Sequence, residues 1–278
     1  MTEANNPSTQ REVRKGSFLA RIIAVTNQKG GVGKTTTAVN LSASLAMAGA
    51  SSLLVDMDPQ GNASSGLGHN PRELAKSIYH ALLGEVGLSS VLKSTGIPGL
   101  NLLPSQAGLS GLEVELVGRE KRSYYLKQLL STVEDQYDYI IIDSPPSLGL
   151  LTVNVLCAAN SLLIPIQCEY YALEGLGQLL NVVKRVQEGL NPALQVEGIL
   201  LTMYDKRLSL SRQVAQEAIR YFDDKVYRTM IPRNVKLSEA PSFGKPIVLY
   251  DIESTGARSY IQLAQEVMNA EKGIGKGA

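Results

Sequence analysis

Short apolar runs alternate with longer segments of helical periodicity along most of the chain. Runs of Val, Ile and Leu without polar alternation are typical of strands buried on both faces. The predicted strands are residues 21–27, 51–58, 137–143, 160–167, 196–204 and 225–232, together with a short apolar run at 99–104. The predicted helices are residues 34–49, 71–84, a segment near 121–134, and residues 171–190, 209–222 and 255–270.

This alternation predicts a single doubly wound α/β domain, with a mostly parallel sheet and helices on both faces. We expect the domain to span residues 21–272. Residues 1–20 are polar and predict a disordered tail, and the glycine-rich residues 273–278 predict a flexible one. In such sheets, ligands bind beyond the carboxyl ends of the strands.

Composition excludes several classes of protein. The 278 residues are 44% hydrophobic and 19% charged, with a formal net charge of +1, so nucleic-acid binding would require a local basic cluster. The sequence contains neither a signal-peptide core nor an apolar run of about 18 residues, and we expect a cytoplasmic protein without a membrane span. Cys157 and Cys168 lack C-x-x-C spacing, which favours reduced thiols over a metal or redox site.

A glycine-rich loop follows the first predicted strand and opens the first predicted helix. Backbone N–H groups of such a loop can surround a polyphosphate, while Lys34 contacts the β- and γ-phosphates and Thr35 binds Mg²⁺. The candidate nucleotide-binding residues are Lys29, Gly30, Gly31, Val32, Gly33, Lys34, Thr35 and Thr36. A turn without a ligand is the alternative. A second lysine, Lys29, is unusual because the phosphates require only one.

Carboxylates stand at the ends of two other predicted strands. Asp143 ends the run YIIID and precedes two prolines, which turn the chain sharply. Asp56 and Asp58 end the second strand, where alternate residues share a face. Thr35, Asp56 and Asp143 are therefore the candidate metal ligands, although acids in ordinary turns would show the same spacing. Residues 59–62 form a loop that could respond to the γ-phosphate.

Four segments resemble one known family. KGGVGKTT, LLVDMDPQGNASSGLG, YIIIDSPPSLGLLTVNVL and TMIPRNVKLSEAPSFGKPI are similar to the ParA/Soj chromosome- and plasmid-partitioning ATPases, which belong to the deviant Walker A class of P-loop NTPases. The resemblance covers residues 21–270, nearly the whole chain. The DPQGNA and IPRNVKLSEAPS segments favour the short chromosomal type, which lacks an N-terminal helix-turn-helix domain.

The resemblance implies roles for individual residues. Lys29 matches the lysine that crosses a dimer interface to the nucleotide of the other subunit, although a cation beside its own anion site is the simpler alternative. The implied catalytic residues are Lys29, Lys34 and Asp58, with Asp58 positioning the attacking water. Asp143 matches the Walker B acid, Asp56 supports the metal, and Pro232 and Asn234 lie against the adenine.

The resemblance also implies an ATP-dependent homodimer that binds double-stranded DNA without sequence preference. Arg207 and Lys236 match the family's basic positions, and Lys206, Arg212 and Arg233 are close to them in sequence. Without the family, each cation would more simply belong to a solvated face. A ParB-like centromere-binding protein would stimulate slow ATP hydrolysis, and the protein would associate with the nucleoid.

Other functions share the phosphate loop. A ParA-like ATPase could position a different cellular cargo. A MinD-like membrane ATPase would end in a cationic amphipathic helix, whereas this sequence ends in AEKGIGKGA, a poor helix. An iron-protein-like reductase would need cysteines in other contexts. A ligase of the dethiobiotin synthetase kind would lack Lys29 and the IPRN segment.

Overall fold

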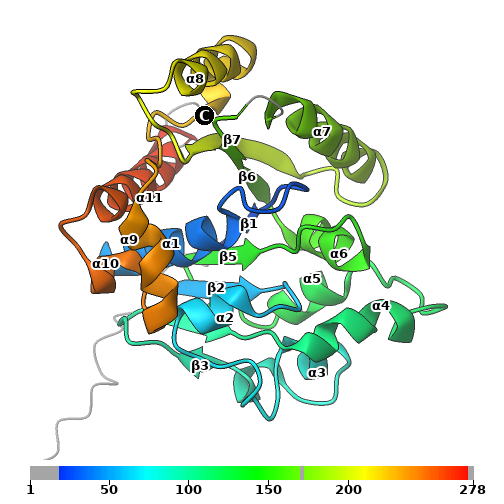
Figure 1. Cartoon of the computed structure of the whole chain (residues 1–278). Helices are drawn as coiled ribbons and strands as arrows, with labels where there is room; N and C mark the ends of the chain where they lie inside the picture. Colours follow the sequence, from blue (N-terminus) through cyan, green and yellow to red (C-terminus); the bar gives the residue numbers. More distant parts are fainter. Residues whose placement is uncertain (1–18, 170–171, 275–278) are drawn as a thin grey trace, which may run out of the picture.

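The computed structural model describes residues 19–169 and 172–274, so most of both predicted tails lies outside the described residues. Its centre is a seven-stranded sheet in the order β3-β4-β2-β5-β1-β6-β7 (Figure 1). Every neighbouring pair is parallel except β3 and β4. The strands are β1 Arg21–Val25, β2 Ser52–Asp56, β3 Lys93–Ser94, β4 Leu100–Leu103, β5 Tyr139–Asp143, β6 Ser161–Gln167 and β7 Gln195–Thr202. The predicted α/β fold is confirmed.

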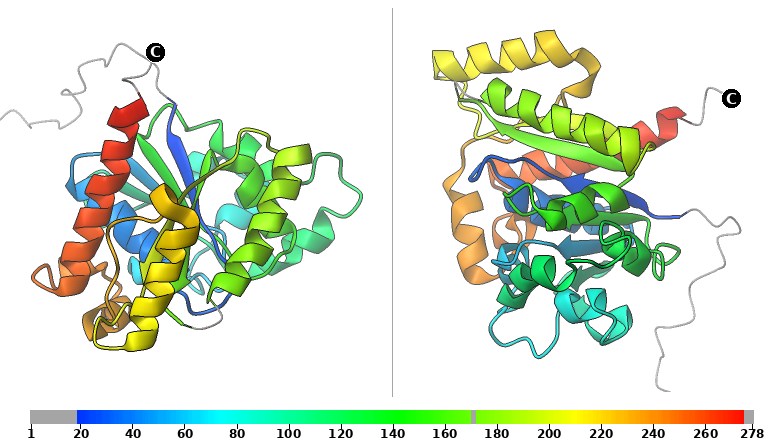
Figure 2. Two further views of the ribbon diagram at one scale, coloured as in Figure 1. Left: turned by 90° about the horizontal axis from the view of Figure 1, so that it is seen from above. Right: turned by 90° about the vertical axis from the view of Figure 1, so that its right-hand side faces the viewer.

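Helices cover both faces of this sheet, as the view from above shows for α7 and α11 (Figure 2). None of the helices within residues 19–169 and 172–274 has the length and apolar character needed to cross a lipid bilayer. The α-helices are α1 Lys34–Met47, α2 Asn62–Gly66, α3 Ile78–Leu82, α4 Leu112–Glu115, α5 Tyr125–Leu130, α6 Leu150–Ala158, α7 Ala172–Gly189, α8 Ser209–Phe222, α9 Val235–Glu239, α10 Ile247–Tyr250 and α11 Thr255–Ile274. The 3₁₀ turns are η2 Leu88–Ser90, η3 Ala107–Gly111, η4 Asp223–Lys225 and η5 Ala240–Phe243.

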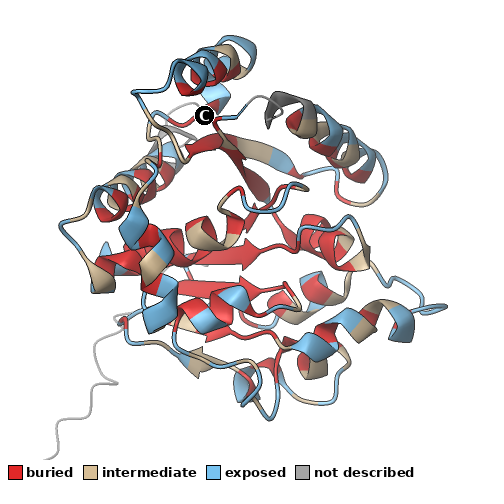
Figure 3. Cartoon of the chain, viewed as in Figure 1, coloured by how far each residue is buried: buried red, intermediate tan, exposed pale blue. Residues whose placement is uncertain are grey.

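Alternate residues of each strand enter two different cores. Ile22 and Ala24 of β1 pack with α3, α5, α6 and α7 on one face, while Ile23 and Val25 pack with α1 and α11 on the other. Most strand residues are buried, apart from β3 and the first residues of β7, because the central strands are covered on both faces (Figure 3). This double burial explains why their sequences are continuously apolar.

Several segments differ from the sequence-based expectation. Residues 225–232, predicted as a strand, make only isolated parallel bridges to β7 and its extension, between Val226 and Ile199 and between Pro232 and Tyr204. Pro232 has no N–H to continue a ladder. The predicted helix at 71–84 is reduced to Ile78–Leu82. Helix α11 continues to Ile274, into the segment predicted as a tail.

The loop after α2 touches the turn after η5 directly. A Cβ on Gly244 would lie 2.7 Å from the Cα of Gly68, and both glycines have positive φ angles, +83° for Gly68 and +60° for Gly244. Neither position therefore accepts an ordinary side chain without strain. Through this contact the segment that follows β2 is packed against the segment that follows α9.

Candidate nucleotide-binding site

The glycine-rich loop leaves the carboxyl end of β1 and is held from several directions. Asn27 Nδ2 donates to the carbonyl of Pro165 at 2.8 Å, and the Thr202 hydroxyl donates to the carbonyl of Val32 at 2.9 Å. Gly31 and Gly33 have φ angles of +74° and +89°, the left-handed region that glycine adopts without strain. Gly33 is the N-cap of α1, so the loop ends at the positive end of a helix dipole.

Lys34 is buried at the base of this loop, with 7% of its surface exposed. Its Nζ donates to the carbonyl of Lys29 at 3.0 Å. Burial lowers the pKa of the Lys34 ammonium, and the carboxylates of Asp143 and Asp58 oppose this change. A desolvated cation at the end of a ring of glycine amides has the chemistry of a phosphate-binding group.

Asp56 and Asp143 lie side by side on adjacent strands. They are register partners in the β2–β5 ladder and, by the alternation of the strands, they point to the face covered by α1. Asp56 is fully buried and accepts hydrogen bonds from Ser64 N (2.8 Å) and Ser64 Oγ (2.7 Å). Burial raises the pKa of Asp56 to about 6, against the effect of these hydrogen bonds.

Asp143 is equally buried, but neither of its carboxylate oxygens has a hydrogen-bond partner among the described residues. Burial, and then the charge of Asp56, raises the pKa of Asp143 well above its ordinary value, while Thr35 and Lys34 oppose the rise. An orphaned carboxylate beside a threonine hydroxyl is a set of oxygen donors that fits Mg²⁺. No three His, Cys, Asp or Glu side chains of residues 19–169 and 172–274 converge on one point, so water and phosphate oxygens must complete such a site.

The loop, the helix start and the segment after β2 enclose a cavity of about 390 Å³. Asp58 is nearly buried at its edge and accepts a hydrogen bond from Gln60 N at 3.0 Å. The lining residues are Gly30, Gly31, Gly33, Lys34, Thr35, Thr36, Asp58, Gln60, Asn62, Pro146 and Met203. The cavity thus combines the predicted phosphate group Lys34, the predicted metal ligand Thr35 and the predicted water-positioning group Asp58, whereas Asp56 and Asp143 are buried and are not among its lining residues.

Some of the predicted nucleotide residues do not line this cavity. The Lys29 ammonium forms an exposed ion pair with Glu169 at 3.5 Å. Pro232 forms an isolated bridge with Tyr204. The side-chain Oδ1 of Asn234 caps α9 by accepting a hydrogen bond from Leu237 N, while Asn234 Nδ2 donates to the Thr255 hydroxyl. Their roles toward a nucleotide stay predictions.

The predicted DNA-binding cations lie at the β7–α8 connection and on α9. The Arg233 backbone N–H donates to the Tyr204 carbonyl, which brings residue 233 to the connection that carries Lys206 and Arg207. Arg207 forms an ion pair with Asp205 at 2.7 Å, and its hydrogen bonds lower the pKa of Asp205 to about 2. In addition, Arg212 donates to the Lys206 carbonyl.

On α9, the ammonium of Lys236 pairs with Glu239 at 3.0 Å and lies 5.6 Å from the ring centre of Tyr250. Both Arg207 and Lys236 are therefore held by a carboxylate. The structure places these cations on exposed elements, and their contact with DNA stays a prediction.

Sequence reasoning missed several partners in the site. Ser64, which holds Asp56, and Thr202, which holds the loop, are distant in sequence from their partners. Glu169 is 140 positions from Lys29. No local pattern distinguishes these residues. Only the loop at 59–62, which carries Gln60 and Asn62, was indicated by its place after Asp58.

Comparison with known proteins identifies close relatives. The sequence profile of the family described as AAA domain matches residues 20–196. Over 249 residues the chain is 56% identical to the sporulation initiation inhibitor protein Soj of Bacillus subtilis, covering 90% of this chain and 98% of Soj. It is 53% identical to the chromosome partitioning protein ParA of Myxococcus xanthus, covering 94% and 92%.

A solved structure is also similar. The cobyrinic acid a,c-diamide synthase of Mycobacterium smegmatis, crystallised with bound ADP and magnesium, has a TM-score of 0.81 and 39% identity. The match covers 91% of this chain and 96% of that one.

Proposed function

The chain belongs to the family of Soj and ParA chromosome-partitioning ATPases, and from this membership we propose that it is an ATP-gated, dimerising DNA-binding switch. The protein hydrolyses ATP to ADP and phosphate, with Mg²⁺ as its metal. The observation that carries the proposal is the buried carboxylate of Asp143, which lies beside Thr35 and Lys34 and has no hydrogen-bond partner among residues 19–169 and 172–274. Such a group is costly to bury unless a cation joins it.

The residues that line the cavity and the buried carboxylates near it have distinct parts in hydrolysis. Lys34 and the loop amides would hold the phosphates, and Thr35 and Asp143 would hold Mg²⁺, which would supply positive charge against the phosphate oxygens. Asp58, at the cavity edge, orients the attacking water. Asp56 accepts hydrogen bonds from Ser64 and from Asp58 N, so its oxygens are already bonded to protein groups. We therefore assign it an indirect role, in which it fixes the loop after β2 and does not bind the metal itself.

We assign to Lys29 the contact that links the two subunits of the dimer through the nucleotide. Its ammonium points to an exposed glutamate and not into the cavity of its own subunit. An exposed ion pair of this kind contributes little free energy, so Lys29 can leave Glu169 for the nucleotide of a second copy. A charge donated in trans links ATP binding to dimerisation as coupled equilibria.

The DNA surface is assigned to Lys206, Arg207, Arg233 and Lys236. Phosphate contacts by such cations release counterions, and a dimer brings twice as many as a monomer. The ATP dimer is then the DNA-binding form at the nucleoid, and a ParB-like partner bound at a centromere-like site triggers hydrolysis and release.

The test is binding to a random-sequence DNA duplex with ADP and with ATP, using Asp58→Ala to hold the ATP state. Binding with ATP alone, weakened steeply by salt, is the expected result. Arg207→Gln should weaken it, whereas Arg185→Gln on α7 serves as a charge-matched control. If ATP dimers form but bind no DNA, the DNA surface is wrong while the ATPase assignment stands.

A further inference from the structure

A second pocket adjoins the nucleotide cavity and has no part in the function described above. It has a volume of about 650 Å³, and its lining includes Gln60 and Asn62, which also line the nucleotide cavity. The amide of Asn62 donates to the Gln60 side-chain oxygen at 3.2 Å. This pair of neutral amides therefore stands between the two spaces.

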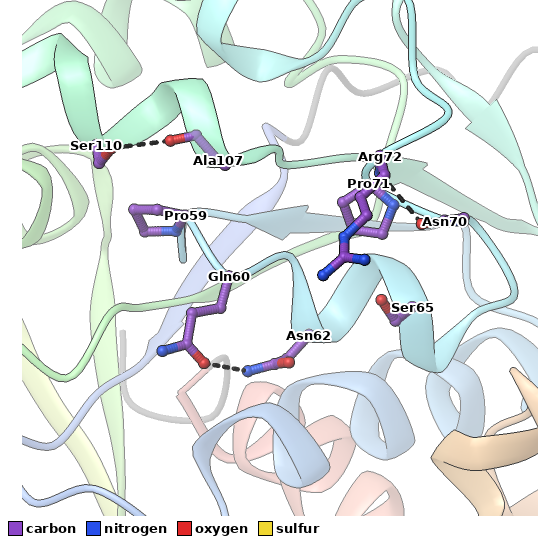
Figure 4. A pocket seen from close by; sticks show the side chains of 9 residues that line it. All are labelled: Pro59, Gln60, Asn62, Ser65, Asn70, Pro71, Arg72, Ala107 and Ser110. Carbon is purple, nitrogen blue, oxygen red and sulfur yellow. Dashed lines mark hydrogen bonds between the residues drawn. The ribbon is translucent and has the colours of Figure 1, made fainter.

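The chemistry of the second pocket favours an anion. Arg72 is its cation, and Figure 4 shows the arginine side chain pointing into the pocket. The other polar lining groups are neutral amides and hydroxyls, from Asn70, Ser65 and Ser110 as well as Gln60 and Asn62, and the remainder are two prolines and an alanine. Among residues 19–169 and 172–274, no carboxylate lines the pocket. Glu73, next in sequence, instead accepts a hydrogen bond from the Asn70 amide.

Arg72 differs from the cations of the predicted DNA surface. Arg207 and Lys236 are each paired with a carboxylate. The guanidinium of Arg72 makes no ion pair or hydrogen bond with residues 19–169 or 172–274, although its backbone N–H donates to Asn70 Oδ1. A planar guanidinium with free donors in a pocket of neutral donors can bind a tetrahedral oxyanion through paired hydrogen bonds.

The backbone holds this pocket in shape. Gly61 has a φ angle of +65°, and a Cβ there would lie 2.4 Å from Cγ of Pro71. The loop that carries Gln60 and Asn62 is thus packed directly against the segment that carries Arg72. The proline ring beside Arg72 packs against this loop because glycine at position 61 leaves room for it.

We propose that this pocket is a second oxyanion site, in which Arg72 binds the inorganic phosphate that leaves the nucleotide cavity after hydrolysis. ATP hydrolysis converts ATP and water into ADP, phosphate and a proton. The phosphate then passes the Gln60–Asn62 pair into the Arg72 pocket before it reaches solvent. The inference rests on ATP hydrolysis at the neighbouring cavity, but on neither dimerisation nor DNA binding.

The first arm of the test uses calorimetry to measure equilibrium binding of inorganic phosphate to the full chain, with Mg²⁺ and a non-hydrolysable ATP analogue already bound. The analogue fills the γ-phosphate position, so any further phosphate must bind elsewhere. We expect Arg72→Gln to weaken binding about tenfold or more, as for loss of a charge-assisted hydrogen bond, and Arg72→Lys to weaken it less. Arg185→Gln should bind phosphate like the parent protein.

The second arm measures phosphate inhibition of ATP turnover. Because phosphate in the Arg72 pocket coexists with nucleotide, inhibition should persist at saturating ATP and weaken about tenfold in Arg72→Gln. Loss of phosphate binding when the analogue is present, unchanged binding in Arg72→Gln, or inhibition that is purely competitive with ATP would each overturn the proposal. Thermal melting identifies any variant that is misfolded, in which case Arg72→Lys replaces Arg72→Gln as the test.

Discussion

The nucleotide cavity and the basic surface at the β7–α8 connection and on α9 place their charged groups in opposite electrostatic environments. In the cavity, Lys34 is buried against a single carbonyl and Asp143 has no hydrogen-bond partner among the described residues. On the surface, Arg207 and Lys236 are exposed and each already has a carboxylate partner. In the cavity the charged groups are buried and a nucleotide with its metal ion can complete their contacts, whereas on the surface each cation is exposed and is already paired with a carboxylate.

This difference predicts how strongly each region depends on its ligand. A buried group without a partner lowers the free energy of unfolding, and the ligand that completes it recovers that free energy. An exposed cation that exchanges a carboxylate for a DNA phosphate gains little from each contact. Affinity for DNA must then come from many weak contacts, whereas affinity for nucleotide can come from a few strong ones.

The largest effect should be the difference between substituting Lys34 and substituting Lys29, the two lysines of the loop. Lys34→Ala removes the buried phosphate cation, and ATP hydrolysis should fall about 100-fold or more, as for other preorganised charge-stabilising groups. Lys29→Ala removes one member of an exposed pair, so nucleotide affinity of the monomer should change by less than about threefold. Fluorescent-nucleotide titration of dilute protein measures this affinity. An equal loss of affinity in both variants would place Lys29 in its own site.

A smaller effect should appear in stability. Asp143→Asn removes a buried charge that has no hydrogen-bond partner among the described residues, so the nucleotide-free protein at pH 8 should gain about 1 kcal/mol in free energy of unfolding. The stabilisation of the parent protein by Mg²⁺ and ATP, about 2.7 kcal/mol at a ligand concentration 100 times Kd, should largely disappear in the variant. Chemical denaturation with and without nucleotide measures both. A less stable nucleotide-free variant would show that the carboxylate supports the fold.

The smallest effect concerns the surface. Asp205→Asn frees Arg207, and DNA affinity of the ATP form should rise about twofold to threefold. The pKa of Asp205 is lowered to about 2, so its pair with Arg207 is present above the ordinary aspartate pKa and is lost only as pH falls toward 2. The effect of the substitution should therefore be constant between pH 5 and pH 8. Fluorescence anisotropy of labelled DNA measures it.

Glu188→Gln frees Lys184 on α7 in the same way and is the matched control for Asp205→Asn, since it should leave DNA affinity unchanged. If Asp205→Asn lowers DNA affinity, Asp205 orients Arg207 for phosphate and does not compete with it. The carboxylate partner of Arg207 would then assist DNA binding, and the contrast between the two regions would not hold at this residue.

The strands that are covered on both faces of the sheet could be predicted from the sequence. Continuous apolar runs at Arg21–Val25 and Tyr139–Asp143 predicted strands covered on both faces, and the structure has them. Helix α6, Leu150–Ala158, was missed because it is buried on most sides and its sequence LLTVNVLCA has no polar stripe. Residues 225–232 have the composition of a strand, but their ladder beside β7 is interrupted, and composition does not reveal that.

The candidate site was predictable only in its local part. The spacing of Gly33, Lys34 and Thr35 along the chain, and the position of Asp143 at a strand end, follow from local sequence. The pair formed by Lys29 and Glu169 depends on the return of the chain after β6. Such a contact is set by the tertiary fold, and sequence spacing contains no information about it.

The contact between Gly68 and Gly244 has a mechanical consequence. Where two backbones meet, no side-chain rotamer lies between them to absorb a displacement. A shift of α2, which begins immediately after the Asp58–Gly61 turn, must therefore move η5 and the end of α9, or open the contact. The two segments should therefore move together, so that a displacement near Asp58 is expected to change the position of Lys236.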